Sequence, residues 1–197
     1  MGSAFPNPSY SAHVLQHAYR DAQAYLFEPM LASHEAHALM LARCGIISDE
    51  NAAAILGAVE EIRIAGVDAL EYQPGVEDLF FRIESQIIEM IGPDFGGNLQ
   101  LARSRNDLGH ALARMALRVE LLTLTADLLA LRRAILALAL RHTETLMPGY
   151  THTQPAQPVT FAHYLAGVLT ALGKDQTRLA MAYANMNESP LGAAAFT

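Results

Sequence analysis

The sequence is poor in charge, cysteine and aromatic residues, and each shortage narrows the possibilities. Only 17% of its 197 residues are charged while 52% are hydrophobic, so we expect some apolar surface to be buried between chains. The single cysteine, Cys44, excludes an internal disulfide and fits a reducing compartment. Tryptophan is absent and aromatic residues make up 7%. Alanine, leucine and methionine dominate instead, which favours helix over strand.

Several functional signals are also missing. The net charge of -7 argues against nucleic acid or an anionic membrane as the main partner. Residues 1–30 have no basic segment followed by an apolar run, so we expect no secretory signal and a cytoplasmic protein. Residues 119–140 are apolar but carry four charges, Glu120, Asp127, Arg132 and Arg133, which makes membrane insertion unfavourable. There is no phosphate loop, dinucleotide fingerprint, zinc spacing or serine-hydrolase elbow.

Apolar residues recur with helical spacing through most of the chain. Together with helix-end signals they predict helices at residues 11–27, 29–42, 49–65, 75 or 76 to 90, 105–146 and 158–186. We expect Pro29 in a first turn, Ser48 as an N-cap, Gly66 as a stop and Pro158 at the first position of its helix. Residues 92–97 and 147–161 are predicted as loops, and no strand signal exceeds the weak one at 98–102.

The helix predicted at residues 105–146 is unusually long. At about 1.5 Å per residue it would span roughly 60 Å, more than the width of a compact globule of this size. It therefore needs partners, and the simplest source is other copies of the same chain.

The first candidate site is the segment that opens this long helix. Arg105 offers a planar fork for a carboxylate, while Ser104, Asn106 and the helix-terminal N–H groups add donors. Together they suit a dianionic acid. The alternative is that Ser104 or Asn106 only caps the helix and the arginines are solvated.

The second candidate site is the proline-punctuated segment 147–161. Thr151 and His152 can bind an oxyanion and move a proton near neutral pH, with Gln154 and Gln157 beside them. The alternative is that His152 only bonds the loop to itself. His34 and His37 are spaced for a metal pair, but no cysteine or carboxylate set completes a site, so we expect no metal.

Three segments together carry a family resemblance. They are SRND at 104–107, MPGYTHTQPAQPVTFAHYL at 147–165 and the closing SPLGAAAF, with a weaker echo in EDLFFRIE at 77–84. From about residue 28 to 197 the chain resembles the argininosuccinate lyase branch of the aspartase/fumarase superfamily.

The resemblance implies an all-α fold with a long-helix bundle. It implies a smaller N-terminal helical domain at 1–104, followed by the first part of the central bundle at 105–197. It also implies a homotetramer that eliminates fumarate from an N-substituted aspartate through an aci-carboxylate intermediate, without metal or organic cofactor. Such a site must aim donors at the carboxylate on which negative charge develops.

The resemblance also assigns roles to residues. Ser104, Arg105 and Asn106 would bind the carboxylates of a small dicarboxylate substrate, helped by Thr151. His152 would assist proton transfer or the developing charge. Gln154 and Gln157 would line or support the pocket.

The sequence departs from the family at three places. The usual HTG before RSRND is Gln100-Leu101-Ala102, the histidine usual after the Glu-Asp pair is Phe80, and residues 31–37 read LASHEAH. Fumarate release is therefore better supported than argininosuccinate as the substrate. Another N-succinyl amine or an aminopolycarboxylate such as ethylenediamine-disuccinate is an alternative. So are a catalytically silent crystallin-like scaffold and a helical oligomerisation module.

The mobile serine loop typical of the family has no match in residues 1–197. We therefore expect this stretch alone to be inactive. Because the long helix separates the two candidate segments within one chain, we expect them to meet only across subunits.

Overall fold

The computed structural model describes residues 6–192 and is mostly helical. It divides into two compact units, one running to Ala116 with a segment from Ser189, the other Leu117–Glu188. The all-α fold with long helices is confirmed. The predicted domain boundary at residues 104/105 coincides with the first residue of α7 (Arg105–Leu140) and stays a prediction. The last residues of SPLGAAAF, from 193, lie outside the described residues.

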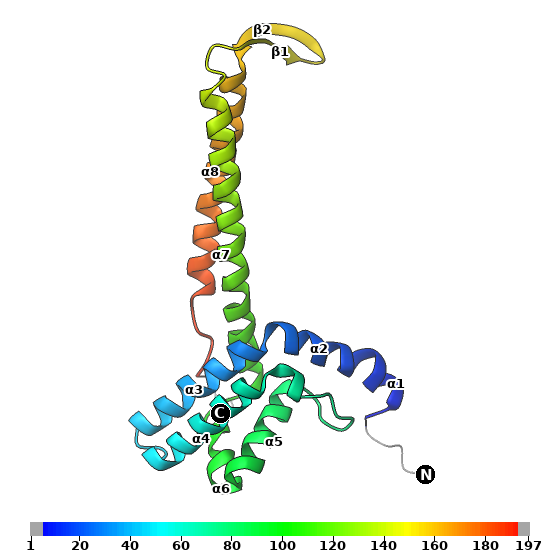
Figure 1. Ribbon diagram of the computed structural model, residues 1–197, viewed down its shortest axis with the longest axis vertical. Helices are drawn as coiled ribbons and strands as arrows, with labels where there is room; N and C mark the ends of the chain where they lie inside the picture. Colours follow the sequence, from blue (N-terminus) through cyan, green and yellow to red (C-terminus); the bar gives the residue numbers. More distant parts are fainter. Residues whose placement is uncertain (1–5, 193–197) are drawn as a thin grey trace. The chain divides into compact units, whose positions relative to one another are not determined.

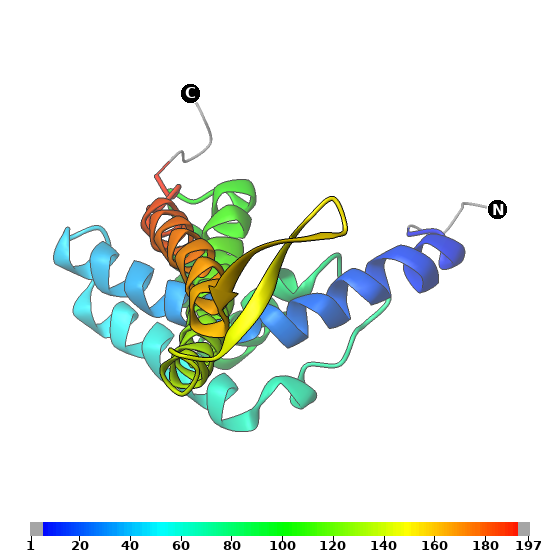
Figure 2. The same cartoon turned by 90° about the horizontal axis from the view of Figure 1, so that it is seen from above.

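Short and medium helices build the first unit. They are α1 (Pro8–Tyr10), the π-helix η1 (Ser11–Leu15), α2 (Gln16–Tyr25), α3 (Phe27–Arg43), α4 (Asp49–Ala65), the 3-10 helix η2 (Val67–Ala69), α5 (Leu79–Ile91), α6 (Pro93–Gly96), the 3-10 helix η3 (Gly97–Gln100) and the first turns of α7. Helices α3 and α4 lie side by side, and α5 packs against α4 and α6 (Figures 1 and 2). The helix expected at 11–27 instead starts at Pro8, includes a π-turn and ends at Tyr25.

The core of this unit comes from one apolar stripe on each helix. Leu31 and Leu41 of α3, Ile55 of α4 and Leu79 and Ile83 of α5 are all fully buried. In α3, Leu31, Ala38 and Leu41 follow at intervals of seven and three residues, and in α5 Leu79 and Ile83 are four residues apart, so each set lies on one face of its helix. Burial of such side chains stabilises the fold by about 1.5–3 kcal/mol each.

The helix ends follow the local signals in most cases. Ser48 Oγ accepts a hydrogen bond from Asn51 N at 3.1 Å, which confirms the predicted N-cap of α4. Gly66 ends that helix with φ +80°, a conformation that favours glycine. Pro29 lies in the first turn of α3, as predicted, although that helix begins two residues earlier, at Phe27.

The predicted start of α5 was wrong by three to four residues. The helix begins at Leu79 because Asp78 has extended backbone and caps it, accepting a hydrogen bond from Phe81 N at 3.0 Å. The loop predicted at residues 92–97 was also wrong, and the weak strand signal at 98–102 produces no strand at residues 93–100. They form α6 and η3, since Pro93 suits a first helical position and starts a new turn directly after Gly92.

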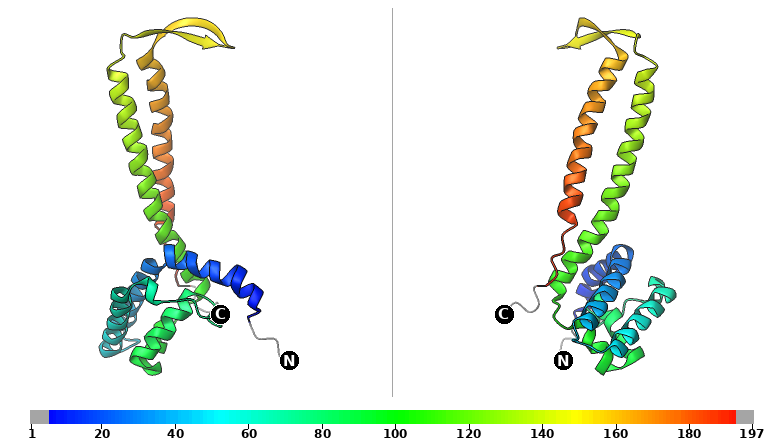
Figure 3. Two further views of the ribbon diagram at one scale, coloured as in Figure 1. Left: turned by 45° about the vertical axis from the view of Figure 1, so that its right-hand side comes forward. Right: turned by 90° about the vertical axis from the view of Figure 1, so that its left-hand side faces the viewer.

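The second unit contains the remainder of α7, a hairpin and α8 (Phe161–Met186). Helix α7 has 36 residues, a length of about 54 Å. It ends at Leu140 rather than the predicted 146, because residues 141–145 form turns in which His142 N donates to Ala139 O. Within this unit α7 and α8 run side by side (Figure 3). Arg132 of α7 bonds Gln176 of α8, and Arg118 Nη1 donates to Asn187 Oδ1 at 2.8 Å.

Large apolar side chains remain exposed on these two helices. They include Leu117, Val119, Leu122, Leu124, Leu131, Leu136 and Leu140 of α7 and Val168 and Met181 of α8. A monomer rarely leaves so many leucines in water. This surface therefore supports the expectation that the long helices pack against other copies. Among residues 6–192, no helix reaches the length and apolarity that crossing a membrane requires.

The predicted loop at 147–161 is in fact an antiparallel β-hairpin. Strands β1 (Leu146–Thr151) and β2 (Gln154–Thr160) pair from Leu146↔Thr160 to Thr151↔Gln154, with an irregularity between Pro148 and Tyr150 (Figure 2). Prolines cannot donate to a ladder, so they suggested a loop, but a two-stranded ribbon has only edge strands and tolerates them. Pro158 lies in β2, and Thr160 caps α8 by accepting from His163 N at 3.1 Å.

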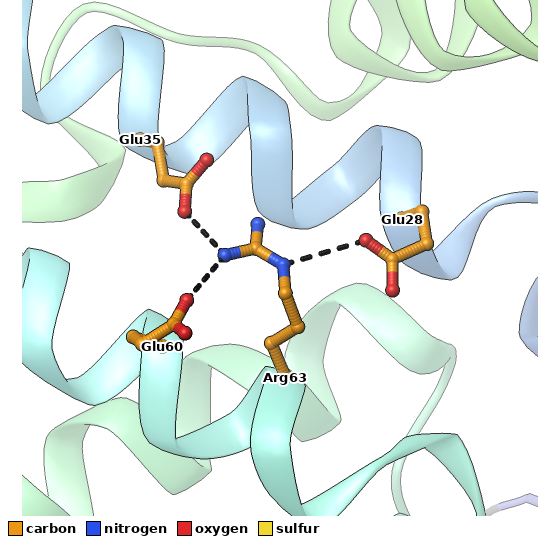
Figure 4. A network of polar contacts seen from close by, with 4 residues as sticks. All are labelled: Glu28, Glu35, Glu60 and Arg63. Atoms are coloured by element: carbon orange, nitrogen blue, oxygen red, sulfur yellow. Dashed lines mark hydrogen bonds and ion pairs between the residues drawn. The ribbon is translucent and has the colours of Figure 1, made fainter.

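An ion-pair network ties α3 to α4 (Figure 4). Arg63 Nη1 donates to Glu35 at 2.6 Å and Glu60 at 2.7 Å, and Nε lies 3.4 Å from Glu28. The hydrogen bond to Glu35, with the other two carboxylates, raises the pKa of Arg63. The Arg63 guanidinium on α4 thus links that helix to the carboxylates of Glu28 and Glu35 on α3.

Replacing Arg63 by Met is expected to lower the free energy of unfolding by about 1 kcal/mol, since exposed pairs contribute little singly but a network contributes more. Urea unfolding at low and high salt would measure this loss. Arg178→Met is the matched control, because the Arg178 side chain is 71% exposed and forms a local ion pair with Asp175. Equal losses in the two variants would contradict the role of the network.

Candidate active site

The segment 103–107 forms the N-terminal end of α7. Ser104 Oγ accepts a hydrogen bond from Asn106 N at 3.2 Å, and Ser104 N donates to Asp107 Oδ1 at 3.2 Å. Ser104 therefore caps the helix, as the structural alternative for this segment predicted. Ser104 is still partly exposed and Asn106 is exposed, so both offer polar side chains at a helix N-terminus, where partial positive charge favours an anion.

The Arg105 side chain is not merely solvated. Its Nη1 lies 3.0 Å from Asp78 Oδ2 and 3.3 Å from Glu77 Oε2, and its guanidinium carbon lies 4.3 Å from the ring centroid of Phe81. Stacking on the ring and two ion pairs fix the plane of the fork. The α5 N-terminus thus holds the arginine that the sequence assigned to carboxylate binding.

A buried pair lies beneath this segment. Arg103 Nη1 donates to His34 Nδ1 at 3.1 Å and its Nη2 donates to Leu99 O at 2.9 Å. Burial lowers the pKa of Arg103 to about 10, although Glu84 and Asp107 oppose the shift. These bonds pin the turn at Ala102, whose φ of +57° is unusual for a residue other than glycine.

His34 is neutral in this setting. Burial, with Arg103 and His37 nearby, lowers the pKa of His34 from 6.5 to about 3. Because Arg103 only donates, His34 Nδ1 is the acceptor and the proton sits on Nε2. In the described part of the chain that Nε2 has no hydrogen-bond partner.

This histidine should make stability depend on pH. Below pH 6.5 the unfolded chain binds a proton at His34, whereas the folded chain does not bind it until about pH 3, because the pKa of the folded state is lower. Stability is therefore lost as pH falls through this window, at up to about 1.4 kcal/mol per pH unit. Urea unfolding of His34→Gln between pH 7 and pH 4 should show a shallower loss, while exposed His13→Gln should follow the wild type. Parallel curves for wild type and His34→Gln would contradict the assignment.

The second segment places His152 at the tip of the hairpin. His152 and Thr153 are the two residues between the paired Thr151 and Gln154, with φ of +49° and +66°. Two consecutive positive φ values define the tight turn that suits a hairpin twist, and they usually call for Asn and Gly. Thr153 Oγ1 donates to His152 O at 2.6 Å, which ties the turn to itself through the backbone and leaves the imidazole outside that bond.

The other predicted residues surround this tip. Thr151, His152, Gln154 and Gln157 are all exposed, so their donors and acceptors are available to a ligand or partner. Gly149 allows the strands to approach, since a Cβ there would lie 2.9 Å from Gln157 O. Ser104, Arg105 and Asn106 belong to the first unit and the hairpin residues to the second.

The remaining histidines have separate surroundings. His37 Nε2 donates to Leu101 O at 2.8 Å, and His142 contacts the Phe161 ring at 5.3 Å between centroids. In residues 6–192, no three His, Cys, Asp or Glu side chains gather as a metal site would require. His34 and His37 instead bond separate partners in the segment 101–103, Arg103 and the carbonyl of Leu101.

Sequence reasoning missed the contribution of Glu77 and Asp78, to which it gave no role beyond a weaker echo of the family motif. It also missed Arg103 as a buried anchor. The available signal was the position of Asp78 directly before an apolar helical run, which is typical of an N-cap. No local signal indicates that Asp78 reaches Arg105, 27 residues later.

The sequence of the chain is similar to those of a known protein family. A sequence profile of the family described as Lyase matches residues 10–197. The chain is 45% identical over 166 residues to argininosuccinate lyase 1 of Shouchella clausii, covering 84% of this chain and 33% of that protein. It is 48% identical over 176 residues to the argininosuccinate lyase of Halobacterium salinarum, covering 89% and 36%.

Solved structures show the same likeness in three dimensions. The crystal structure of EDDS lyase in complex with formate superposes with a TM-score of 0.77 at 32% identity, over 95% of this chain and 37% of that one. A variant of the same enzyme has been solved with bound fumarate. The chain spans about a third of the length of the curated relatives it matches.

Proposed function

Because the chain belongs to the lyase family, in the argininosuccinate lyase branch of the aspartase/fumarase superfamily, we propose that the whole protein is a carbon–nitrogen lyase. It eliminates fumarate from an N-substituted aspartate. The observation that carries this proposal is the Arg105 fork beside Ser104 and Asn106 at the N-terminus of α7, a set of donors suited to carboxylates.

The chemistry proceeds in two steps in this proposal. A base removes a proton from the carbon next to one carboxylate, and the electron pair moves into that carboxylate to form an aci-carboxylate. The C–N bond then breaks, releasing fumarate and the amine. Ser104, Arg105 and Asn106, helped by Thr151, bind the carboxylates and stabilise the added charge. His152 assists proton transfer or the developing charge, and Gln154 and Gln157 line the pocket.

We further propose that the protein is a cytoplasmic homotetramer whose active sites are shared between subunits. The exposed leucines of α7 support an assembly of long helices. The division of the predicted site residues between two units supports sharing, as does the length of the helix argued above from the sequence. The exposed free thiol of Cys44 fits a reducing compartment.

An ultraviolet absorbance assay for fumarate tests the function. The full-length protein would be given a panel of N-substituted aspartates, including argininosuccinate and ethylenediamine-disuccinate. Release of fumarate from at least one member, with its amine in equal amount, is the expected result. A folded full-length protein that releases none from the whole panel would contradict the proposal.

A further inference from the structure

An apolar cavity adjoins the arginine of the candidate site. It has a volume of about 130 Å³ and lies among α2, α3, α5 and the first turns of α7, all within the first unit. Arg105 and Asp78 are its charged lining residues, and the others include Leu26, Met30, Phe80 and Leu112. The cavity is therefore an apolar chamber with one opposite-charge pair in its wall.

The exposure of the lining residues shows which end of the chamber faces solvent. The side chains of Arg105 and Asp78 are 39% and 41% exposed, whereas Leu79 and Leu112 are 0% and 2% exposed. The charged pair thus lies toward solvent and the leucines form the floor. A ligand that enters would meet the charges with its polar end and the floor with its apolar end.

The charged pair can recognise two groups at once. Both ion-pair contacts of Arg105 use Nη1, so Nε and Nη2 supply the parallel N–H donors that a carboxylate takes. Asp78 accepts from Phe81 N through Oδ1 and meets Arg105 through Oδ2, at a position where it is part exposed. A carboxylate and a neighbouring ammonium on one carbon match this arrangement of opposite charges.

Gly109 keeps the chamber open on the α7 side. It lines the cavity in the second turn of the helix, a position where glycine stabilises a helix less than alanine does. A Cβ at this position would meet nothing within 4 Å, so packing inside the chain does not require glycine. A larger side chain here would therefore have free space around its Cβ and would occupy part of the cavity that Gly109 lines.

We propose that this chamber receives an apolar substituent on the leaving amine, and that Asp78 binds the protonated nitrogen while Arg105 binds the adjacent carboxylate. The inference rests on the proposed function and names its substrate class: N-alkyl, N-benzyl or N-aryl aspartates whose apolar end is no larger than a benzene ring. A cavity of about 150 Å³ with apolar walls is known to hold benzene, which sets this size.

The full-length protein would be assayed for fumarate release from N-methyl-, N-butyl- and N-benzylaspartate, with argininosuccinate as the polar reference. We expect kcat/KM to rise about fourfold per added methylene until the chamber is full. Gly109→Leu should lower kcat/KM for N-benzylaspartate at least tenfold relative to N-methylaspartate, with Gly109→Ala intermediate. Gly57→Leu is the matched control on an open helical position of α4, with nothing within 4 Å of its Cβ.

Asp78→Asn separates charge from structure. Asparagine caps a helix about as well as aspartate, so α5 should keep its N-cap. The variant should raise KM for every N-substituted aspartate, and the melting temperature should stay near that of the wild type. An unchanged KM would overturn the role of Asp78.

A flat dependence on substituent size, or a preference for argininosuccinate, would overturn the chamber while leaving the lyase function intact. If no substrate releases fumarate, the proposed function fails separately. Calorimetric binding of N-benzyl- against N-methylaspartate would then decide on the chamber alone: tighter N-benzyl binding that Gly109→Leu abolishes supports it, and equal binding overturns it.

Discussion

Replacing His152 by Asn in the full-length protein is expected to lower kcat by about 10²–10⁴-fold, the range typical of a lost proton-transfer group. Asparagine keeps a polar side chain and tolerates the positive φ of this turn position, so the hairpin should survive the change. KM should change much less than kcat, because the carboxylate donors lie on α7. The measurement is steady-state fumarate release with the best substrate of the panel.

His13→Asn provides the matched control for this experiment. His13 is an exposed histidine of η1 in the other unit and has no proposed role in the site. It should retain wild-type kcat. If His152→Asn also retained wild-type kcat, His152 would serve only to shape the turn, which is the structural alternative for this residue.

Replacing Arg105 by Lys is expected to lower kcat/KM by about 10²–10³-fold, the loss typical when a preorganised donor to a developing oxyanion is removed. Lysine keeps the charge but loses the fork and the planar stacking on Phe81, from whose ring centroid the guanidinium carbon lies 4.3 Å. Both kcat and KM should worsen, since the same carboxylate is held in the ground state and in the transition state.

Arg178→Lys is the matched control, since Arg178 pairs with Asp175 on an exposed face of α8. Full-length variants of both kinds would be compared by fumarate release and by thermal unfolding. A fully active Arg105→Lys protein would remove Arg105 from the carboxylate site. A loss of activity that merely followed unfolding would be visible in the melting curves.

The sequence predicted three helix-end signals correctly, and all three are local. Ser48, Gly66 and Pro29 act through their immediate neighbours, by a side-chain hydrogen bond, a positive φ and a pre-set φ. The hairpin could not be predicted in the same way. Its prolines weaken every local strand signal, and only the pairing of residues 146–151 with 154–160 makes the segment extended.

The candidate site was predictable in its chemistry but not in its contacts. The residue types of Ser104, Arg105 and Asn106 indicate donors for a carboxylate wherever they lie. Their partners come from elsewhere in the chain: Asp78 and Phe81 from the start of α5, and His34 from α3 through Arg103. Contacts across such separations follow from helix packing, which single-sequence patterns do not specify.

The tip of the hairpin exposes a trade-off between stability and use. Two residues with Cβ atoms, His152 and Thr153, sit in left-handed backbone conformations that cost about 1–2 kcal/mol each. An Asn-Gly turn would fold more readily, yet it would carry no imidazole. Designs aimed only at stability would favour this replacement. Screens that select only for a higher melting temperature should therefore discard the residue that the proposed chemistry needs.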